Sequence, residues 1–581
     1  MKRLIFIITF LLMTKTFYCQ TNDLNTKPVT IDNEFNSSSK IKEISLNPTK
    51  VENLKTLGLV WGFLKYYHPN IAKGNFNWDY ELFRILPKII NSKNNEDFDI
   101  ILVKWIQNLG TFQENQKANE NLGEIKMKPD LDWISNSKFS KELTELLLSI
   151  KNAERTNNNY YVNILFDGVG PPSFLNENPY SKMKYPDAGY RILALYRYWN
   201  IIQYYFPYKY LIGEDWKNVL KEFVPKIISA KNETEYTLTI LELIGRINDS
   251  HANVWGGNQI LNNYYGINYA PLNLTFAENK AVVTYFNDNN LCKEIGLQIG
   301  DVISKINDES VDDIVKKNLK YTPASNYPTK LNNIALRTLL RTNDTVLNIE
   351  YISGNQLKNK MIKVSSSNKS LIWKKYFDNT ADTCFTLISP KIAYLNQGSL
   401  KGSHISKIWK EIKNTNGLII DARHSPTYSP LDSLCNYLYP KKIPFSQFTI
   451  GSIKTPGLFT FEYIDSAGKE NTGFYKGKVI ILVNENTQSA SEYHVMAYQK
   501  APNSMVIGSK TAAADGNVSP IFYLPGEIMT MISGMGVYYP DGEETQRVGI
   551  KVDLEIKPTI EGIKNGQDEL LEKAIEIINE H

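Results

Sequence analysis

The chain has 581 residues, which is enough for roughly three or four domains of about 150 residues each. Hydrophobic residues make up 42% and charged residues 22%, close to the globular average, so a mostly disordered chain is excluded. The balance of 65 Lys and Arg against 61 Asp and Glu gives no general electrostatic attraction to nucleic acid or to an anionic membrane, and we expect neither as a partner.

The first 20 residues have the pattern of an export signal. Lys2 and Arg3 precede the apolar run Leu4–Met13, which is shorter than the 20 or so residues that a membrane-spanning helix needs. We therefore expect an exported protein that is periplasmic, on the outer surface or secreted, with a linker over residues 21–45 and no transmembrane segment. Cys19 leaves anchoring by a lipid open, although bulky residues precede it where a lipidation site needs small ones.

An internal repeat occupies the first half of the chain, at the offset of 138 residues that separates Trp61 from Trp199. Each copy has an apolar stripe at helical spacing that ends at a proline, so each predicts a helical unit. We assign residues 46–190 to the first unit with a connecting segment, and residues 191–265 to the second. The shared residues are Trp61, Tyr66, Tyr67, Pro69, Trp78, Leu82, Pro87, Lys88, Ile89, Ile90, Lys93 and Asn94, which recur as Trp199, Tyr204, Tyr205, Pro207, Trp216, Leu220, Pro225, Lys226, Ile227, Ile228, Lys231 and Asn232.

The two copies diverge at one polar triplet. Asp249, Ser250 and His251 of the second copy stand opposite an unrelated Gly-Thr-Phe sequence at residues 110–112 of the first. Packing explains residues that the copies share, whereas a polar triplet found in one copy needs another reason. We therefore take His251 as a candidate for chemistry.

Short β-prone runs follow over residues 266–368. They are Leu272–Phe276, Ala281–Phe286 and Val346–Ile352. Between them, the Gly-Leu-Gln-Ile-Gly-Asp-Val-Ile sequence from Gly296 resembles the core signature of a PDZ domain, a fold that captures an extended peptide beside a sheet edge. The alternative is that these glycines only form a turn.

Residues 369–581 alternate strands with helices and predict an α/β domain. The predicted strands are Ile392–Asn396, Gly417–Arg423 and Val479–Asn484, and the predicted helix between the first two is Ile405–Lys413. The third strand leads into Ser489 at the start of another helical pattern. Unpaired N–H groups and the helix dipole there favour negative charge, so the Ala490 N–H can help to hold an oxyanion. Ser489 and Glu492 also match a helix capping box, which by itself would explain both residues.

The order of these features resembles peptidase family S41, which includes the C-terminal processing proteases and tricorn proteases. The features are the helical repeat ending in Asp-Ser-His, the PDZ-like module, the Gly-Leu-Ile-Ile-Asp-Ala-Arg strand and Ser-Ala-Ser-Glu at a helix start. The resemblance covers roughly residues 190–581. It implies a multidomain α+β protein with duplicated helical units, a PDZ-like β-rich domain and a C-terminal α/β peptidase domain of the β/α spiral, crotonase-like kind.

The same resemblance implies the site residues. It places the nucleophile at Ser489, and it places the second oxyanion donor near Ser425, after the strand. The processing-protease branch carries a lysine base at the position of Ala514, so lysine catalysis is not expected here. The tricorn-like branch uses a serine and histidine pair, which resembles Ser250 and His251. A neutral imidazole accepts a proton near neutral pH, as a general base must.

A glutamate late in the tricorn-like sequence pattern supports the histidine. The matching residue here is Gln546, and Glu544 would serve if the register shifts by two. Glutamine can orient a partner but cannot balance an imidazolium charge. His424, near the expected oxyanion region, is the rival general base to His251.

We therefore predict an exported serine peptidase that hydrolyses protein or peptide substrates through an acyl-enzyme. The departures at Ala514 and Gln546 leave an alternative, a catalytically inactive peptide-binding or scaffold protein with the same architecture. Outside the signal only Cys292, Cys384 and Cys435 remain, without the close spacing of a zinc site, and no nucleotide-binding loop is present. We expect no metal and no cofactor, and the oligomeric state is left open.

Overall fold

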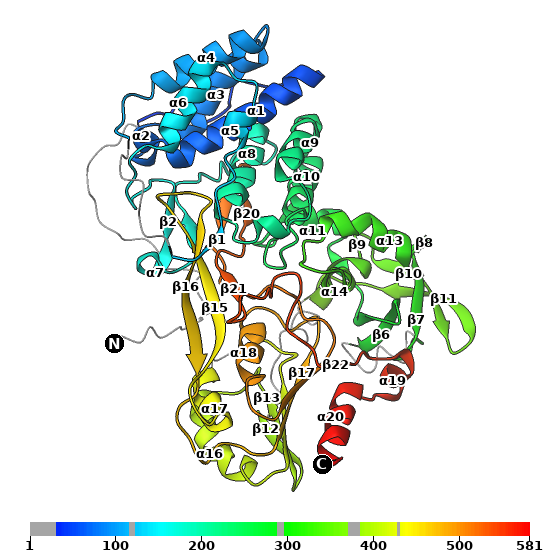
Figure 1. Ribbon diagram of the computed structural model, residues 1–581. Coiled ribbons are helices and arrows are strands. Elements are labelled where there is room, and N and C mark those ends of the chain that lie inside the picture. Colours follow the sequence, from blue (N-terminus) through cyan, green and yellow to red (C-terminus); the bar gives the residue numbers. More distant parts are fainter. Residues whose placement is uncertain (1–30, 115–122, 287–295, 370–383, 427–429, 581) are drawn as a thin grey trace.

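The computed structural model describes residues 31–114, 123–286, 296–369, 384–426 and 430–580. The predicted signal, Cys19 and Cys292 lie outside these ranges. Helices gather at the N-terminal end, a β-rich unit lies to one side, and a second sheet flanked by helices forms the C-terminal end (Figure 1). The predicted α+β class is therefore confirmed.

The two helical copies fold in the same way. Both begin with a long helix, α1 or α8, and continue into a pair of helices. The bounds are α1 Pro48–Tyr67, α2 Pro69–Ala72, α3 Trp78–Ile90, α4 Asn95–Gln107, α5 Trp133–Asn136, α6 Lys141–Lys151, α8 Ala188–Tyr205, α9 Trp216–Ser229, α10 Glu233–Gly245 and α11 Gln259–Tyr265. The helix caps Asn94 and Asn232 keep the repeat register, because each accepts a hydrogen bond from the first turn of its helix.

A reciprocal tryptophan pair explains why the repeat keeps its aromatic residues. The indole N–H of Trp61 donates to the Trp78 carbonyl and that of Trp78 donates back, at 3.1 and 3.0 Å. Trp199 and Trp216 repeat this exchange at 2.7 and 3.1 Å. Each pair is stacked and buried, so it satisfies both indole groups without water.

The long helices of the two copies pack directly against each other. Asn200 of α8 donates to the Gly58 carbonyl of α1 at 3.1 Å. A Cβ atom at Gly62 would lie 1.8 Å from the Asn200 side chain, so only glycine allows the backbones to come this close. The copies therefore share one buried aromatic core.

The middle segment forms a six-stranded sheet in the order β11-β10-β7-β6-β5, with β8 beside β7 (Figure 1). The bounds are β5 Leu272–Ala277, β6 Lys280–Phe286, β7 Val302–Ile306, β8 Glu309–Ser310, β10 Val346–Ser353 and β11 Gln356–Lys363, with helices α13 Val311–Asn318 and α14 Tyr327–Ile334 and the short pair β4 Asn268–Tyr269 and β9 Arg341–Thr342. The three strands expected in this segment are confirmed.

The C-terminal sheet has the order β12-β13-β14-β17-β18-β22 and is parallel from β13 onward. The bounds are β12 Phe385–Ser389, β13 Ile392–Asn396, β14 Gly417–Asp421, β17 Lys478–Val483, β18 Ser504–Gly508 and β22 Leu554–Glu555, and the helices are α16 Gly402–Ile412, α17 Leu431–Leu438, α18 Ala490–Tyr498, α19 Ile560–Asn565 and α20 Glu569–Asn579. Leu418 and Ile420 face α16 and α17, and Ile419 faces α20. Both faces are covered, which explains the continuous apolar runs.

Elements far apart in the sequence join the front half to this domain. The order β1-β16-β15-β21 makes a four-stranded antiparallel sheet, and β19-β20 and β2-β3 are separate hairpins. The bounds are β1 Ile125–Met127, β2 Val162–Ile164, α7 Leu165–Gly168, β3 Pro172–Phe174, β15 Ile443–Gly451, β16 Phe459–Ala467, β19 Phe522–Leu524, β20 Ile528–Thr530 and β21 Gly536–Tyr538. The Tyr67 hydroxyl also donates to the Pro456 carbonyl, which closes the junction between α1 and the β15–β16 turn.

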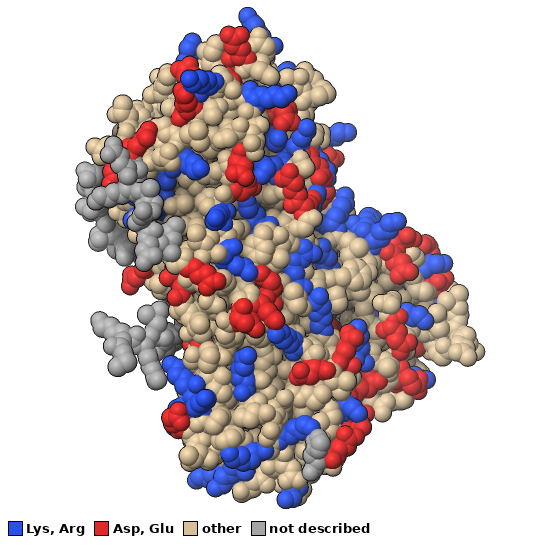
Figure 2. Space-filling view, viewed as in Figure 1, with Lys and Arg blue, Asp and Glu red and all other residues tan. Residues whose placement is uncertain are grey.

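The surface carries both signs of charge. Figure 2 shows Lys and Arg interspersed with Asp and Glu over the visible face. Within the described ranges, no helix combines the length and the apolar character that crossing a bilayer requires.

Candidate active site

Ser489 sits at the turn between strand β17 and helix α18. Its backbone has φ 56° and ψ −122°, a conformation that L residues rarely adopt. A residue that only caps a helix has extended backbone and needs no positive φ. A strained serine at a strand-to-helix turn is instead the geometry that exposes a nucleophilic hydroxyl, and strain of this kind costs about 1–3 kcal/mol. The backbone therefore favours a nucleophile over a simple cap.

Glu492 ties this turn to a neighbouring loop. Its carboxylate accepts from the Ser489 N–H at 3.2 Å, from the Ala513 and Ala514 N–H groups at 2.9 and 3.0 Å, and from the Thr511 hydroxyl at 2.5 Å. Burial raises the pKa of Glu492 to about 7, and these donors oppose the rise. The capping-box glutamate thus fixes the turn against residues 511–515, which we call the 511–515 segment.

His251 is oriented by Ser533 and Asp249. Its Nδ1 lies 2.9 Å from the Ser533 hydroxyl oxygen, and that hydroxyl donates to the Asp249 carboxylate at 2.9 Å. Asp249 also accepts from the N–H groups of Ser533 at 2.8 Å and His251 at 3.1 Å. A hydroxyl has one hydrogen to donate, and Ser533 donates it to the Asp249 carboxylate. The Ser533 oxygen must therefore accept a hydrogen bond from His251 Nδ1–H. This fixes the tautomer and leaves the Nε2 lone pair available as a base.

The surroundings of His251 keep its ring neutral. Burial lowers the pKa of His251 below its ordinary value of 6.5, and the Asp249 carboxylate opposes part of this change. The aspartate lies 3.8 Å from Nδ1 and is fully buried. It can therefore also stabilise an imidazolium that forms during a reaction.

The 511–515 segment brings the two candidate residues to one place. The Ser250 hydroxyl donates to the Ala512 carbonyl at 2.9 Å, and the Ser489 N–H donates to the Ala514 carbonyl at 3.1 Å. Two residues of chain span at most about 7 Å, so the backbones beside the histidine and the serine are anchored close together. Among the described residues, no hydrogen bond joins the Ser489 hydroxyl to the His251 ring. Catalytic hydrogen bonds are often long before substrate binds.

The oxyanion candidates flank the same turn. Ala490 is the first residue of α18, where backbone N–H groups have no partner within the helix. Ser491 donates to the carbonyls of Ala422 and His424 at 2.9 and 3.3 Å, so the loop after β14 packs on the start of α18. Ser425 follows directly in this loop and is exposed.

The two residues expected to support the histidine lie elsewhere. Glu544 pairs with Lys126 at 2.8 Å and accepts from Tyr210 at 2.7 Å, so the structure does not bring it to His251. Gln546 donates to the Ser325 hydroxyl at 3.4 Å. That hydroxyl lies 3.1 Å from the Ser250 hydroxyl, so Gln546 is linked to the neighbour of the histidine only through Ser325.

Sequence reasoning missed the residues that do orient the histidine. Asp249 belongs to the triplet that distinguishes the second repeat, so the divergence between the copies was a usable signal for it. Ser533 lies 282 residues beyond His251 and has no local sequence signal. Asp515 was also missed, and burial beside Glu492 raises the pKa of its carboxyl well above the ordinary value.

Within the described residues, no group of three or more His, Cys, Asp or Glu side chains is arranged to hold a metal ion.

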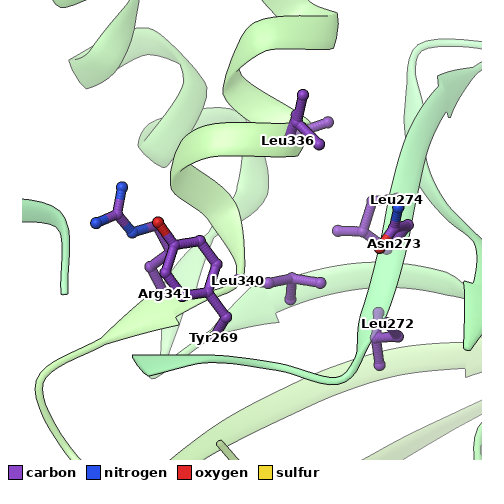
Figure 3. Close-up of a pocket in the computed structure, with 8 residues that line it drawn as sticks. Tyr269, Leu272, Asn273, Leu274, Leu336, Leu340 and Arg341 are labelled. Carbon is purple, nitrogen blue, oxygen red and sulfur yellow. The ribbon is translucent and has the colours of Figure 1, made fainter. Parts of the chain in front are cut away.

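A small pocket lies in the middle segment, where β5 is an edge strand of its sheet. Figure 3 shows the strand residues Leu272 and Leu274 on one side and Leu336 of the helical turn Ala335–Leu339 on the other. The cavity measures about 20 Å³, and one water needs about 10–15 Å³. It therefore has no room for a peptide side chain in this conformation.

Comparison with known proteins identifies the C-terminal domain. Residues 391–556 match the sequence profile of peptidase family S41. The structure of mature CPAF complexed with lactacystin is 12% identical, with a TM-score of 0.53 over 67% of this chain and 98% of that one. A putative peptidase from Parabacteroides merdae is 15% identical, with a TM-score of 0.40 over 67% and 96%. The photosystem II D1 C-terminal processing protease is 14% identical, with a TM-score of 0.37 over 65% and 98%. No curated protein sequence matches.

Proposed function

We propose that this chain, whose residues 391–556 match peptidase family S41, is a serine-type peptidase that hydrolyses peptide bonds through an acyl-enzyme on Ser489 with His251 as the general base. One observation carries this proposal. The 511–515 segment accepts hydrogen bonds both from Ser250, beside the histidine, and from Ser489. The strained backbone of Ser489 is typical of an exposed nucleophile. The fixed tautomer of His251 leaves its Nε2 lone pair available to accept the serine proton.

The proposed cycle begins with proton transfer. His251 Nε2 takes the Ser489 hydroxyl proton while Oγ attacks the carbonyl carbon of the scissile peptide. The imidazolium then gives this proton to the leaving amine, and the C–N bond breaks. Water hydrolyses the resulting ester, with His251 as base again. General base assistance of this kind contributes about 10²- to 10⁴-fold in rate.

Two further groups stabilise the charges that form. The Ala490 N–H at the start of α18 donates to the oxyanion, and we propose a second donor near Ser425. Each such donor is worth about 10²- to 10³-fold in rate. On the other side, the Ser533 hydroxyl and the Asp249 carboxylate hold the imidazolium. Asp249 thereby takes the role that the sequence suggested for Glu544 or Gln546.

Labelling with a fluorophosphonate tests the proposal. We expect wild type to be labelled, Ser489→Ala not to be labelled, and His251→Ala to be labelled about 10²- to 10⁴-fold more slowly. The control is His404→Ala, because His404 lies on α16 and its imidazole contacts the Cys384 thiol. If wild type is unlabelled and casein stays intact, the chain is a scaffold with peptidase architecture. If His251→Ala is labelled at the wild-type rate, histidine is not the base.

The remaining assignments stay proposals. We propose export, which the basic and apolar pattern of residues 1–20 supports. We also propose that residues 46–190, 191–265, 266–368 and 369–581 are the domains, with the third PDZ-like. Edge strand β5 supports the PDZ-like assignment, since such a strand can pair with a peptide. Protein or peptide substrates follow from the proposed reaction.

A further inference from the structure

A second, larger pocket lies away from the proposed catalytic residues. It measures about 520 Å³, within the range of sites that hold small molecules and side chains. Its walls come from the start of α3, from residues 160–161 and 174–180, and from Ile521, Phe522 and Tyr523 at strand β19. The proposed reaction uses none of these residues.

The floor of this pocket holds a buried charge network with one free acceptor. Lys65 pairs with Glu177 at 2.5 Å, and Arg197 pairs with Glu177 and Asp79 at 2.7 and 2.6 Å. The Tyr180 hydroxyl donates to the same Asp79 oxygen, Oδ2, at 2.8 Å. The other oxygen, Oδ1, is buried and has no hydrogen-bond partner. A buried carboxylate oxygen without a donor is costly, so a ligand that donates a hydrogen bond to Oδ1 would gain affinity there.

The charges decide which kind of group fits. The two cations and two anions of this network already balance, so an ionised ligand would add an uncompensated buried charge. A neutral donor, by contrast, would satisfy Oδ1 without changing the balance. The walls are rich in aromatic rings, with Tyr161, Phe174 and Phe522 all buried. Such walls favour a flat ring, which packs edge-to-face or offset against them.

We propose that this pocket binds a tyrosine side chain of a polypeptide substrate, with its ring between the aromatic walls and its hydroxyl donating to Asp79. The proposal rests on the proposed peptidase function. Phenol combines the neutral donor and the flat ring that the floor and walls require. Lysine and arginine side chains fail on charge, and a phenylalanine would leave Oδ1 without a donor.

The position of the pocket supports a substrate as the source of this tyrosine. One wall, Ile521–Tyr523, belongs to the β19–β20 hairpin, which returns to Ser533 beside His251. The base of this hairpin is closed by the Val518–Ser533 bridge and by the Ser519 N–H, which donates to Ile532 O at 2.9 Å. The same wall is also anchored to the floor, because Arg197 donates to the Tyr523 carbonyl at 2.7 Å. The hairpin therefore links one wall of the pocket to the residue that orients His251, which favours a bound substrate as the source of the tyrosine.

The test measures binding without catalysis. N-acetyl-L-tyrosinamide and N-acetyl-L-phenylalaninamide are titrated into the full-length Ser489→Ala protein by calorimetry. A hydrogen bond to a charged group makes the tyrosine compound bind about 10- to 100-fold more tightly. Ile521→Trp fills the mouth from a position that is 39% exposed and should abolish binding. Leu175→Trp, at another lining residue that is equally exposed, is the second blocking variant. Ile464→Trp, on β16 outside the pocket and 50% exposed, should change nothing.

The outcomes separate this proposal from the peptidase proposal. Equal affinity for both compounds, no binding, or binding that survives both blocking variants in folded protein overturns the tyrosine site. Binding of an N-acetylglucosamine oligomer at the pocket, with no tyrosinamide binding, replaces it with a saccharide site. Fluorophosphonate labelling of Ser489 with no tyrosinamide binding leaves the peptidase standing without this site. Tyrosinamide binding without labelling keeps the pocket and removes the peptidase.

Discussion

Removing the Ser533 hydroxyl should slow acylation while leaving the fold intact. In Ser533→Ala, His251 Nδ1–H loses its acceptor at 2.9 Å, and Asp249 loses one of its three donors. The ring is then free to adopt the other tautomer, in which Nε2 carries the proton and cannot accept the one from Ser489. Ser533 acts through the histidine, so it is a positioning residue.

The structure sets the size of this effect. Hydrogen bonds to charged groups contribute about 1.5–3 kcal/mol, which corresponds to about 10- to 150-fold in rate. The loss cannot exceed the 10²- to 10⁴-fold that a general base supplies as a whole. Because Asp249 keeps its bonds to the N–H groups of Ser533 and His251, we expect the lower part of this range, about 10- to 100-fold.

The assay is the rate of fluorophosphonate labelling from pH 5 to pH 9. The pKa of His251 is lowered by burial, so wild type should stay active somewhat below pH 6.5. In Ser533→Ala the rate should fall, and Ser533→Thr, which keeps a hydroxyl, should restore it. The matched control is Ser519→Ala, because Ser519 is equally buried on the same hairpin and its hydroxyl accepts from the Ile532 N–H. An unchanged rate in Ser533→Ala, or an equal loss in Ser519→Ala, would refute the reasoning.

Two further predictions concern the network around this site. Burial raises the pKa of Glu492 from 4.5 to about 7, so the folded state favours the protonated carboxyl. The resulting contribution to the free energy of unfolding, about 3 kcal/mol, is complete below about pH 4.5 and is lost as pH rises through 7. Glu492→Gln should remove this pH dependence, which urea unfolding at pH 5 and pH 8 measures; an unchanged difference would contradict the pKa argument. Gln546→Ala removes one long, neutral bond to Ser325, so the labelling rate should change less than about fivefold, and a loss like that of His251→Ala would instead make Gln546 essential.

Local patterns predicted the elements well. The strand predicted at Ile392–Asn396 has the same bounds in the structure, and the one predicted at Val479–Asn484 is shifted by one residue. The repeat predicted two similar helical units. The structure gives the physical reason for the repeat, since its tryptophans make the same reciprocal hydrogen bonds in both copies. These features depend on periodicity and on short-range packing, which the sequence displays directly.

The junctions between elements could not be predicted in this way. Strand β1, at residues 125–127, pairs with β16 more than 300 residues later, and no local pattern marks it as a partner. The β15–β16 and β19–β20 hairpins were likewise not anticipated. Such pairings depend on how whole domains dock, and the energy that selects them comes from surfaces distant in the chain.

The sequence by itself determined the strands and helices, the family resemblance, and Ser489 and His251 as candidates, since each depends on neighbours in the chain. Only the tertiary structure decided what orients the histidine. Ser533 has this position because the β19–β20 hairpin returns beside the second helical unit, where the buried Asp249 accepts a hydrogen bond from its hydroxyl. A hydroxyl has a defined role only when its donor and acceptor are fixed in space, and here both are supplied by residues more than 280 positions away.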